Sequence, residues 1–334
     1  MKLGIWAPRG GAADEDDIDD AFRFSMQIVK RAEELGFVTT LVAQRLLGQD
    51  LDAWVLAPAL AMATSKIELM LAVHPGVIPP QMIAKMGATL DRISKGRMTI
   101  NIVNGWWQKE LDICGNGAWL DRVGDRYDRM DEYIQVMKGL WTTDHFSFDG
   151  KFYKVDDSPV RFETVRKPWP PLYTASRSDR GKEIIARECD WWFVDYEAGF
   201  RLYDANFALM QRYVADMNRR ADANGRKLRF GISATVIQDD TQEAAEAQAL
   251  GLEEARLHIR EGRSAISAIG AGLVGSPQTI ADRLRRYEDV GIECFMLRFP
   301  HQAEGLERFA HDVIPLIRDR LDAPEPSRAA LAAV

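Results

Sequence analysis

Short apolar runs alternate with longer amphipathic segments along nearly the whole chain. The runs are rich in β-branched and aromatic residues, which is typical of strands that are covered on both faces. The predicted strands are Lys2–Trp6, Thr39–Ala43, Ile67–Val73, Met98–Val103, Pro171–Thr174, Trp191–Val194, Arg229–Ile237 and Cys294–Leu297. Between them, apolar residues recur at helical spacing. The predicted helices are Ala21–Leu35, Trp54–Ala63, Pro80–Ile93, Asp125–Trp141, Asp179–Glu188, Leu202–Asn224, Thr241–Glu261, Thr279–Val290 and Glu304–Leu321.

This strict alternation of strand and helix predicts a closed parallel (β/α)8 TIM barrel. A doubly wound open sheet is the structural alternative. It is disfavoured because Arg9-Gly10-Gly11, which follows the first strand, lacks the glycine-rich phosphate-binding fingerprint and its helix context. We expect one domain over residues 1–322 and a loose carboxyl-terminal tail over residues 323–334.

Two segments depart from the alternation. Phe146–Val155 has Asp149-Gly150 at its centre, which predicts a β-hairpin outside the barrel. Gly262–Gly275 is rich in glycine and comes just before the last strand–helix unit. This position predicts a mobile lid over the mouth of the barrel.

Composition excludes several classes of function. The formal net charge of −7 gives no support for binding to nucleic acid or to an anionic membrane. No apolar run approaches the roughly 20 residues that span a bilayer, and the first residues lack the apolar core of a signal peptide. Cys114, Cys189 and Cys294 lie far apart, so they predict neither a metal site nor a disulfide framework. We therefore expect a soluble cytoplasmic protein.

Polar and aromatic groups gather where the strand Met98–Val103 ends. Asn101 interrupts the apolar run, and Asn104-Gly105-Trp106-Trp107 ends it. Active sites of TIM barrels lie at the carboxyl ends of the strands. Asn101 could bond the edge of a planar cofactor ring, and Trp106 could form a flat wall beside it. The alternative is that Asn101 is a satisfied core amide and that the tryptophans only pack.

A second candidate is the strand-to-helix turn Tyr173–Arg180. A helix amino terminus preceded by small hydroxyl residues, here Ser176 and Ser178, offers backbone N–H groups to a phosphate. Arg177 would add charge and directional donors. The alternative is a simple helix N-cap, which Ser178 could supply alone.

Two histidines and one tyrosine complete the candidates. His74 precedes Pro75-Gly76 at the end of the third strand, and His301 follows the last strand. Histidine titrates near neutral pH and is a common base. The alternative is that a lone histidine in a proline-containing loop is simply an exposed polar residue. Tyr127 opens the helix Asp125–Trp141, where an ordinary helix start is the alternative. The sequence shows neither a nucleophilic triad nor metal-ligand spacing.

Three phrases resemble the bacterial-luciferase-like flavin monooxygenases. They are TLDRISKGR with the following Gly105-Trp106, the run LWTTDHFSFDGKFYKV, and Pro170-Pro171-Leu172-Tyr173. The second phrase is particularly like dimethylsulfone, alkanesulfonate and pyrimidine-ring monooxygenases. The likeness extends over almost all of the chain, from Gly4 to Leu321.

The resemblance implies a two-component enzyme. A separate NAD(P)H-dependent flavin reductase supplies FMNH2, which reacts with O2 in the barrel and oxygenates a substrate, commonly with C–S or C–N cleavage. The catalytic group would comprise His74, Asn101 and Trp106. The cofactor would be held by Ala72, Asn101, Gly105, Trp106, Tyr127, Ser176, Arg177 and Ser178. The substrate would lie near Gln44, His74, Arg298 and His301. Family members are homodimers or homotetramers.

The chain departs from two branches of the family. Ser233 and Thr235 stand where the alkanesulfonate enzymes carry Arg and His, so a linear sulfonate would lose its cation there. Ala72 stands where the pyrimidine-ring enzymes carry a Thr used in oxygen activation. Gly105-Trp106 is kept, so the sulfone pattern is the nearest.

The leading hypothesis is an FMNH2-dependent monooxygenase of a small organosulfur compound, sulfone before sulfonate. The near alternative is oxygenation of a nitrogen heterocycle or another carbon substrate. A deazaflavin-dependent dehydrogenase and a non-catalytic flavin-binding barrel are the further alternatives.

Overall fold

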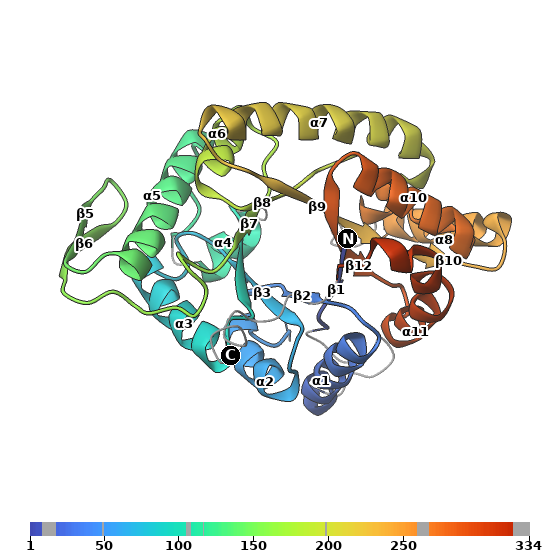
Figure 1. Ribbon diagram of the computed structural model, residues 1–334, viewed down its shortest axis with the longest axis horizontal. Helices are drawn as coiled ribbons and strands as arrows, with labels where there is room; N and C mark the ends of the chain where they lie inside the picture. The colour runs from blue at the N-terminus through green and yellow to red at the C-terminus, as the bar shows by residue number, and fades with distance from the viewer. Residues whose placement is uncertain are drawn as a thin grey trace.

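A closed barrel of eight parallel strands forms the centre of the protein, as predicted (Figure 1). The computed structural model describes residues 1–8, 18–48, 50–104, 108–115, 117–197, 199–258 and 267–322. Around the barrel the strands follow the order β1, β12, β9, β8, β7, β4, β3, β2. Their bounds are β1 Lys2–Trp6, β2 Thr39–Val42, β3 Glu68–Val73, β4 Met98–Ile102, β7 Leu172–Thr174, β8 Trp191–Phe193, β9 Arg229–Thr235 and β12 Ile292–Arg298.

Helices surround this barrel and cover the outward faces of its strands (Figure 1). They are α1 Ile18–Glu34, α2 Ala53–Ala63, α3 Pro80–Ile93, α4 Gln108–Cys114, α5 Val123–Thr142, α6 Asp179–Glu188, α7 Tyr203–Ala223, α8 Gln242–His258, α10 Pro277–Asp289 and α11 Gln302–Asp312. The described residues also form the 3-10 helices η1 Phe200–Leu202, η2 Ser267–Ala271 and η3 Ile314–Arg320. The hairpin of β5 Phe146–Asp149 and β6 Lys154–Ser158 stands outside α5, as predicted.

Local sequence explains where several helices begin and end. Ser276 and Ser178 are N-caps, because their hydroxyls accept from the N–H groups of Thr279 and Gly181. The predicted helix Glu304–Leu321 is instead broken into α11 and η3, since Pro315 lacks the N–H that would continue an α-helix. The sequence pattern does not predict α4, because this helix is short and buries only Glu110 and Leu111.

Most of the predicted strands differ from the structure by one or two residues at their ends, and one is divided. The predicted strand Arg229–Ile237 is divided into β9 and a separate short strand, β10 Ile237–Gln238. β10 pairs in parallel with β11 Val274–Gly275. Ile269, Leu273 and Val274 are fully buried. In the predicted lid, η2 and β11 are therefore packed against the rest of the protein outside the eight-stranded barrel, and residues 262–266 lie outside the described residues.

Charged and aromatic side chains close the amino-terminal end of the barrel. Glu68 pairs with Lys2 at 2.7 Å and with Arg166 at 2.6 Å. The cations of Lys2 and Arg229 lie over the ring of Trp191, 5.4 and 4.1 Å from its centroid. Buried ion pairs of this kind need every partner, because a lone buried charge is costly.

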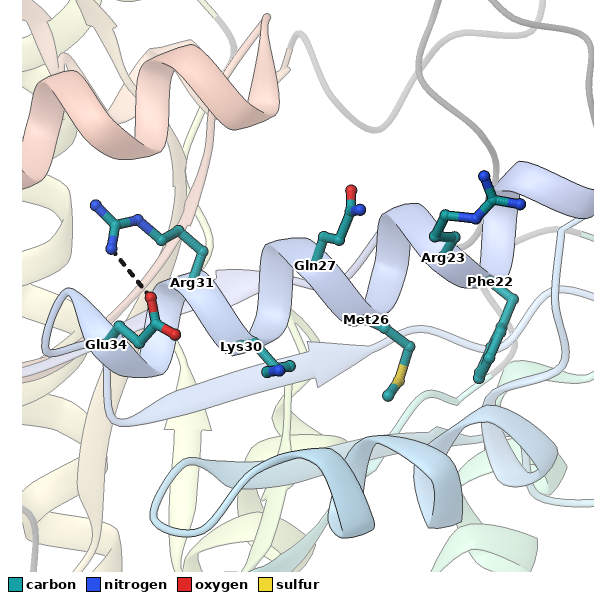
Figure 2. Close-up of a pocket in the computed structure, with 7 residues that line it drawn as sticks. All are labelled: Phe22, Arg23, Met26, Gln27, Lys30, Arg31 and Glu34. Carbon is teal, nitrogen blue, oxygen red and sulfur yellow. Dashed lines mark hydrogen bonds and ion pairs between the residues drawn. The ribbon is translucent and has the colours of Figure 1, made fainter.

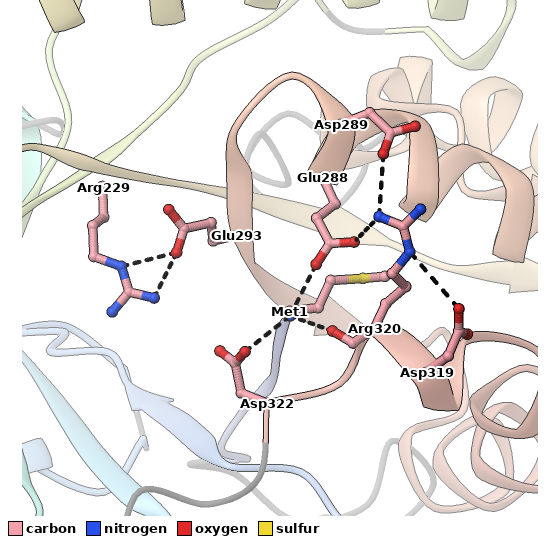
Figure 3. A network of polar contacts seen from close by, with 8 residues as sticks. All are labelled: Met1, Arg229, Glu288, Asp289, Glu293, Asp319, Arg320 and Asp322. Carbon is pink, nitrogen blue, oxygen red and sulfur yellow. Dashed lines mark hydrogen bonds and ion pairs between the residues drawn. The ribbon is translucent and has the colours of Figure 1, made fainter.

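A second network seals the same end (Figure 3). The amino group of Met1 contacts Glu288 at 3.1 Å and Asp322 at 3.3 Å, while Arg320 reaches Glu288 at 3.1 Å. Arg229 pairs with Glu293 at 2.5 Å. With this end plugged, a ligand can reach the barrel interior only from the carboxyl ends of the strands, where TIM barrels place their chemistry.

Candidate active site

The inner wall of the barrel mouth includes Asn101. It pairs in register with Ala72 of β3 and Tyr173 of β7. Tyr173 belongs to the apolar cluster inside the barrel, and residues in register on neighbouring strands face the same side. Asn101 is only partly buried, whereas Ala72 is 2% exposed. The Asn101 amide thus stands beside a small side chain on this wall.

His74 and Gln44 meet across the ends of β3 and β2. The Nε2 atom of His74 lies 3.3 Å from the main-chain oxygen of Gln44. Both residues are buried. Burial lowers the pKa of His74 below its ordinary value, although Gln44 and the carboxylate of Glu110 partly oppose the shift. The imidazole is therefore neutral at pH 7.

A glycine fixes the turn that follows His74. Gly76 has a φ of +94°, a conformation that L side chains rarely adopt. A Cβ at this position would stand 2.4 Å from a guanidinium nitrogen of Arg129 on α5. The close approach of Arg129 to this backbone holds the turn against α5.

Hydroxyl groups converge at the start of α6. The phenol oxygen of Tyr127 lies 2.8 Å from Oγ of Ser176. Oγ of Ser176 in turn lies 3.2 Å from Oγ of Ser178. A Cβ on Gly181 would stand 2.1 Å from Ser176 Oγ and 2.5 Å from the Tyr127 ring. Glycine is thus needed for the helix to approach the cluster. Three hydroxyls at a helix amino terminus are suitable donors for a phosphate.

Arg177 is turned away from this hydroxyl cluster. Its guanidinium binds the carboxylate of Asp195 after β8, and its side chain is 62% exposed. Asp195 therefore already balances the charge that the sequence suggested for a phosphate. His301 also stands apart, because it is exposed at the N-cap of α11 and its side chain makes no capping bond.

A third cluster occupies the mouth between β1, β9 and β12. The indole nitrogen of Trp6 donates to Ser233 Oγ at 3.0 Å, and Tyr196 donates to the main-chain oxygen of Ser233. The guanidinium of Arg298 stacks on Trp6, 3.3 Å from the ring centroid. Arg298 is in register with Thr235. Ser233 and Thr235 carry no charge, so Arg298 is the residue that brings a cation to this part of the barrel mouth.

Sequence reasoning missed Trp6, Tyr196 and Glu110. No local sequence pattern marks Trp6 or Tyr196 as a site residue, because only the closure of the barrel brings them to Ser233. Glu110 has a signal in the sequence, since it opens a short amphipathic segment after Trp107. Gly105 and Trp106, which the sequence analysis predicts to contact the cofactor, lie outside the described residues.

Other parts of the chain offer less chemistry. A hollow on the outer face of α1 is lined by one stripe of that helix, in which Arg31 already pairs with Glu34 (Figure 2). In the described parts of the chain, no group of His, Cys, Asp and Glu is arranged to hold a metal ion. None of the helices described is long and apolar enough to cross a membrane.

A family model described as luciferase-like monooxygenase matches residues 1–294. The chain belongs to this family. It is 27% identical to the FMNH2-dependent dimethylsulfone monooxygenase of Pseudomonas putida, over 99% of this chain and 98% of the relative.

Solved structures show the same fold. DmoA from Hyphomicrobium sulfonivorans superimposes with a TM-score of 0.75 at 20% identity, over 100% of this chain and 92% of DmoA. An F420-dependent secondary alcohol dehydrogenase reaches a TM-score of 0.73 at 20% identity, over 96% of this chain and 99% of that one. The fold alone therefore does not choose between flavin and deazaflavin.

Proposed function

We propose that this protein is the oxygenase of a two-component system that uses FMNH2 and O2 to oxygenate a small sulfone or sulfonate with C–S cleavage. The observation that carries the proposal is the likeness to a dimethylsulfone monooxygenase over 99% of the chain. The geometry supports it, because hydroxyl donors, an inward amide and a stacked cation all lie at the carboxyl ends of the barrel strands.

The residues present fit FMN. The hydroxyls of Tyr127, Ser176 and Ser178 would hold the phosphate at the start of α6, where Gly181 leaves space for their approach. Asn101 would bond the polar edge of the ring, and Ala72 would let the ring lie against β3. Contacts from Gly105 and Trp106 stay predictions.

Reduced FMN supplies the two electrons that split O2, placing one oxygen atom on the substrate and one in water. For dimethylsulfone, insertion into a C–H bond next to sulfur gives a hydroxymethyl sulfone. Its C–S bond then breaks, so that (CH3)2SO2, O2 and FMNH2 yield methanesulfinic acid, formaldehyde, FMN and H2O. The leaving sulfinate keeps the bonding electron pair, and the hydroxyl proton is released as the aldehyde forms.

The chain's own groups would bind, orient and shield the substrate. Arg298, held flat by Trp6, would donate to the sulfonyl oxygens and stabilise the negative charge that develops on the departing sulfinate. Neutral His74 would take the hydroxyl proton at a ring nitrogen. Gln44 would orient His74, and His301 is not needed for this arrangement.

The test is turnover of dimethylsulfone and of a short alkanesulfonate by the protein with FMN, an NAD(P)H-dependent flavin reductase and 18O2. We expect labelled aldehyde with sulfinate or sulfite in equal amount.

Label in a nitrogen heterocycle instead would favour that alternative substrate class. Reduction of an imine or a ketone with reduced deazaflavin would favour a dehydrogenase. Tight binding of FMN with no faster oxidation than free FMNH2 would leave a non-catalytic flavin-binding barrel.

The reductase partner and a homodimer or homotetramer belong to the same proposal. The helix α2 supports self-association, because its sequence AWVLAPALAMA has no charged residue. Val55 and Met62 on it are 77% and 78% exposed. A helix that is apolar on every face is normally covered. The cytoplasmic location stays a prediction.

A further inference from the structure

A buried carboxylate on α4 binds the loop that follows β2. Glu110 is 2% exposed, and its Oε1 accepts from the N–H groups of Leu46 at 2.6 Å and Leu47 at 3.1 Å. The same oxygen accepts from Nε of Arg45 at 3.1 Å. Burial alone would raise the pKa of Glu110, but these partners hold it below the ordinary value. The carboxylate is therefore charged when it binds the loop.

The loop it holds leads directly to the candidate catalytic pair. Gln44 precedes Arg45, and its main-chain oxygen lies 3.3 Å from His74 Nε2. In the barrel, β3 lies between β2 and β4. Because α4 follows β4 in the chain, Glu110 ties the carboxyl end of β2 to the insertion after β4, with His74 between them.

Two other glutamates bind loops in the same way. Glu132 on α5 accepts from the N–H groups of Lys151, Phe152 and Tyr153 in the hairpin. Glu33 on α1 accepts from the N–H groups of Ser65, Lys66 and Ile67, just before β3 begins. The bond type is shared by all three, so only the place of the loop distinguishes Glu110.

We infer that Glu110 is a positioning residue of the active site, which fixes Gln44 and His74 on the substrate side of the mouth by holding residues 45–47. The inference rests on the proposed function. The flavin side depends on other elements, because the hydroxyl cluster of Tyr127, Ser176 and Ser178 is carried by α5 and the loop after β7. Glu110 should thus govern substrate turnover and leave FMN binding unchanged.

The test compares Glu110→Gln with Glu33→Gln, which loses an equivalent set of hydrogen bonds before β3 begins, at the opposite end of the barrel. The readouts are kcat and KM for dimethylsulfone, the affinity for FMN, the melting temperature, and hydrogen exchange at residues 44–47. A misplacement of catalytic groups by about 1 Å can cost about a hundredfold in rate. We therefore expect kcat/KM to fall about ten- to a hundredfold in Glu110→Gln alone, with FMN affinity within about twofold. Residues 44–47 should exchange faster in that variant alone.

Arg45→Gln and Glu110→Asp keep the test decisive if Glu110→Gln folds poorly. Arg45→Gln keeps the carboxylate on the two N–H groups, so it should retain more activity than Glu110→Gln, as should Glu110→Asp. Equal losses of kcat/KM in Glu110→Gln and Glu33→Gln would overturn the inference. An inactive wild-type protein would instead reject the proposed function. Exchange at residues 44–47 then decides, and the inference fails if Glu110→Gln leaves it unchanged.

Discussion

The phenol oxygen of Tyr127 lies 2.8 Å from the hydroxyl of Ser176, although one residue opens α5 and the other follows β7. Ser176 is buried and Tyr127 is partly buried, so each hydroxyl supplies the other with a hydrogen-bond partner. Gly181 allows the contact, because any larger residue would displace Ser176. The pair is therefore a direct place to test for a phosphate site.

Tyr127→Phe should weaken the binding of FMN and leave the binding of riboflavin unchanged. A hydrogen bond to a charged phosphate contributes about 1.5–3 kcal/mol, which is roughly a tenfold to hundredfold change in affinity. Fluorescence titration with both flavins measures the difference. An equal loss for FMN and riboflavin would show that Tyr127 does not act through the phosphate.

Gly181→Ala should reduce FMN affinity because its methyl group would push Ser176 Oγ and the Tyr127 ring apart. We expect about a tenfold loss, since a misplaced donor forfeits most of its bond. Gly124→Ala is the matched control, since Gly124 lies on α5 with nothing within 4 Å of a new Cβ. Unchanged FMN affinity in Gly181→Ala would argue against a ligand between these groups.

Arg298→Gln should raise KM for the organosulfur substrate, and more for an anionic sulfonate than for a neutral sulfone. Charge-assisted hydrogen bonds are about twice as strong as neutral ones. Arg298→Lys should recover only part of the loss, because lysine cannot reproduce the planar stack on Trp6. Arg180→Gln, which breaks an exposed pair with Asp128, is the control. A kcat/KM that is equal to wild type in Arg298→Gln would remove Arg298 from the substrate site.

Acid should destabilise the protein partly through His74. Burial lowers its pKa in the folded state, so the unfolded chain binds the proton more readily below the unfolded pKa of about 6.5. The free energy of unfolding therefore falls as pH drops through about 6.5. His74→Gln should lose this part of the dependence, as measured by urea unfolding at about pH 5.5 and about pH 7.5. The same pH dependence in both proteins would contradict a buried neutral imidazole.

Val55→Lys combined with Met62→Lys should convert the assembled protein to a monomer. Two charges on α2 cannot be buried against an apolar partner without a large desolvation cost. Val160→Lys is the control, because Val160 is 66% exposed and lies outside α2. Light scattering after size exclusion measures the mass. A wild-type protein that is already monomeric would refute the proposed self-association.

Local pattern predicted most of the elements. The bounds Lys2–Trp6, Pro80–Ile93 and Asp179–Glu188 agree with β1, α3 and α6 residue for residue. These segments have strong periodicity and clear end signals, such as Ser178 as an N-cap. The division of Arg229–Ile237 was not predictable, because the split depends on β10 finding β11, a partner far away in the chain.

The sequence by itself determined the barrel, the ring of helices and the strand ends that carry polar groups, because periodicity and capping act over a few residues. Only the tertiary structure decided which of those groups meet. It joined His74 to Gln44 and Tyr127 to Ser176, turned Arg177 toward Asp195, left His301 exposed and set Arg298 on Trp6. Those contacts depend on the stagger of eight strands around a closed barrel, and no local pattern records that stagger.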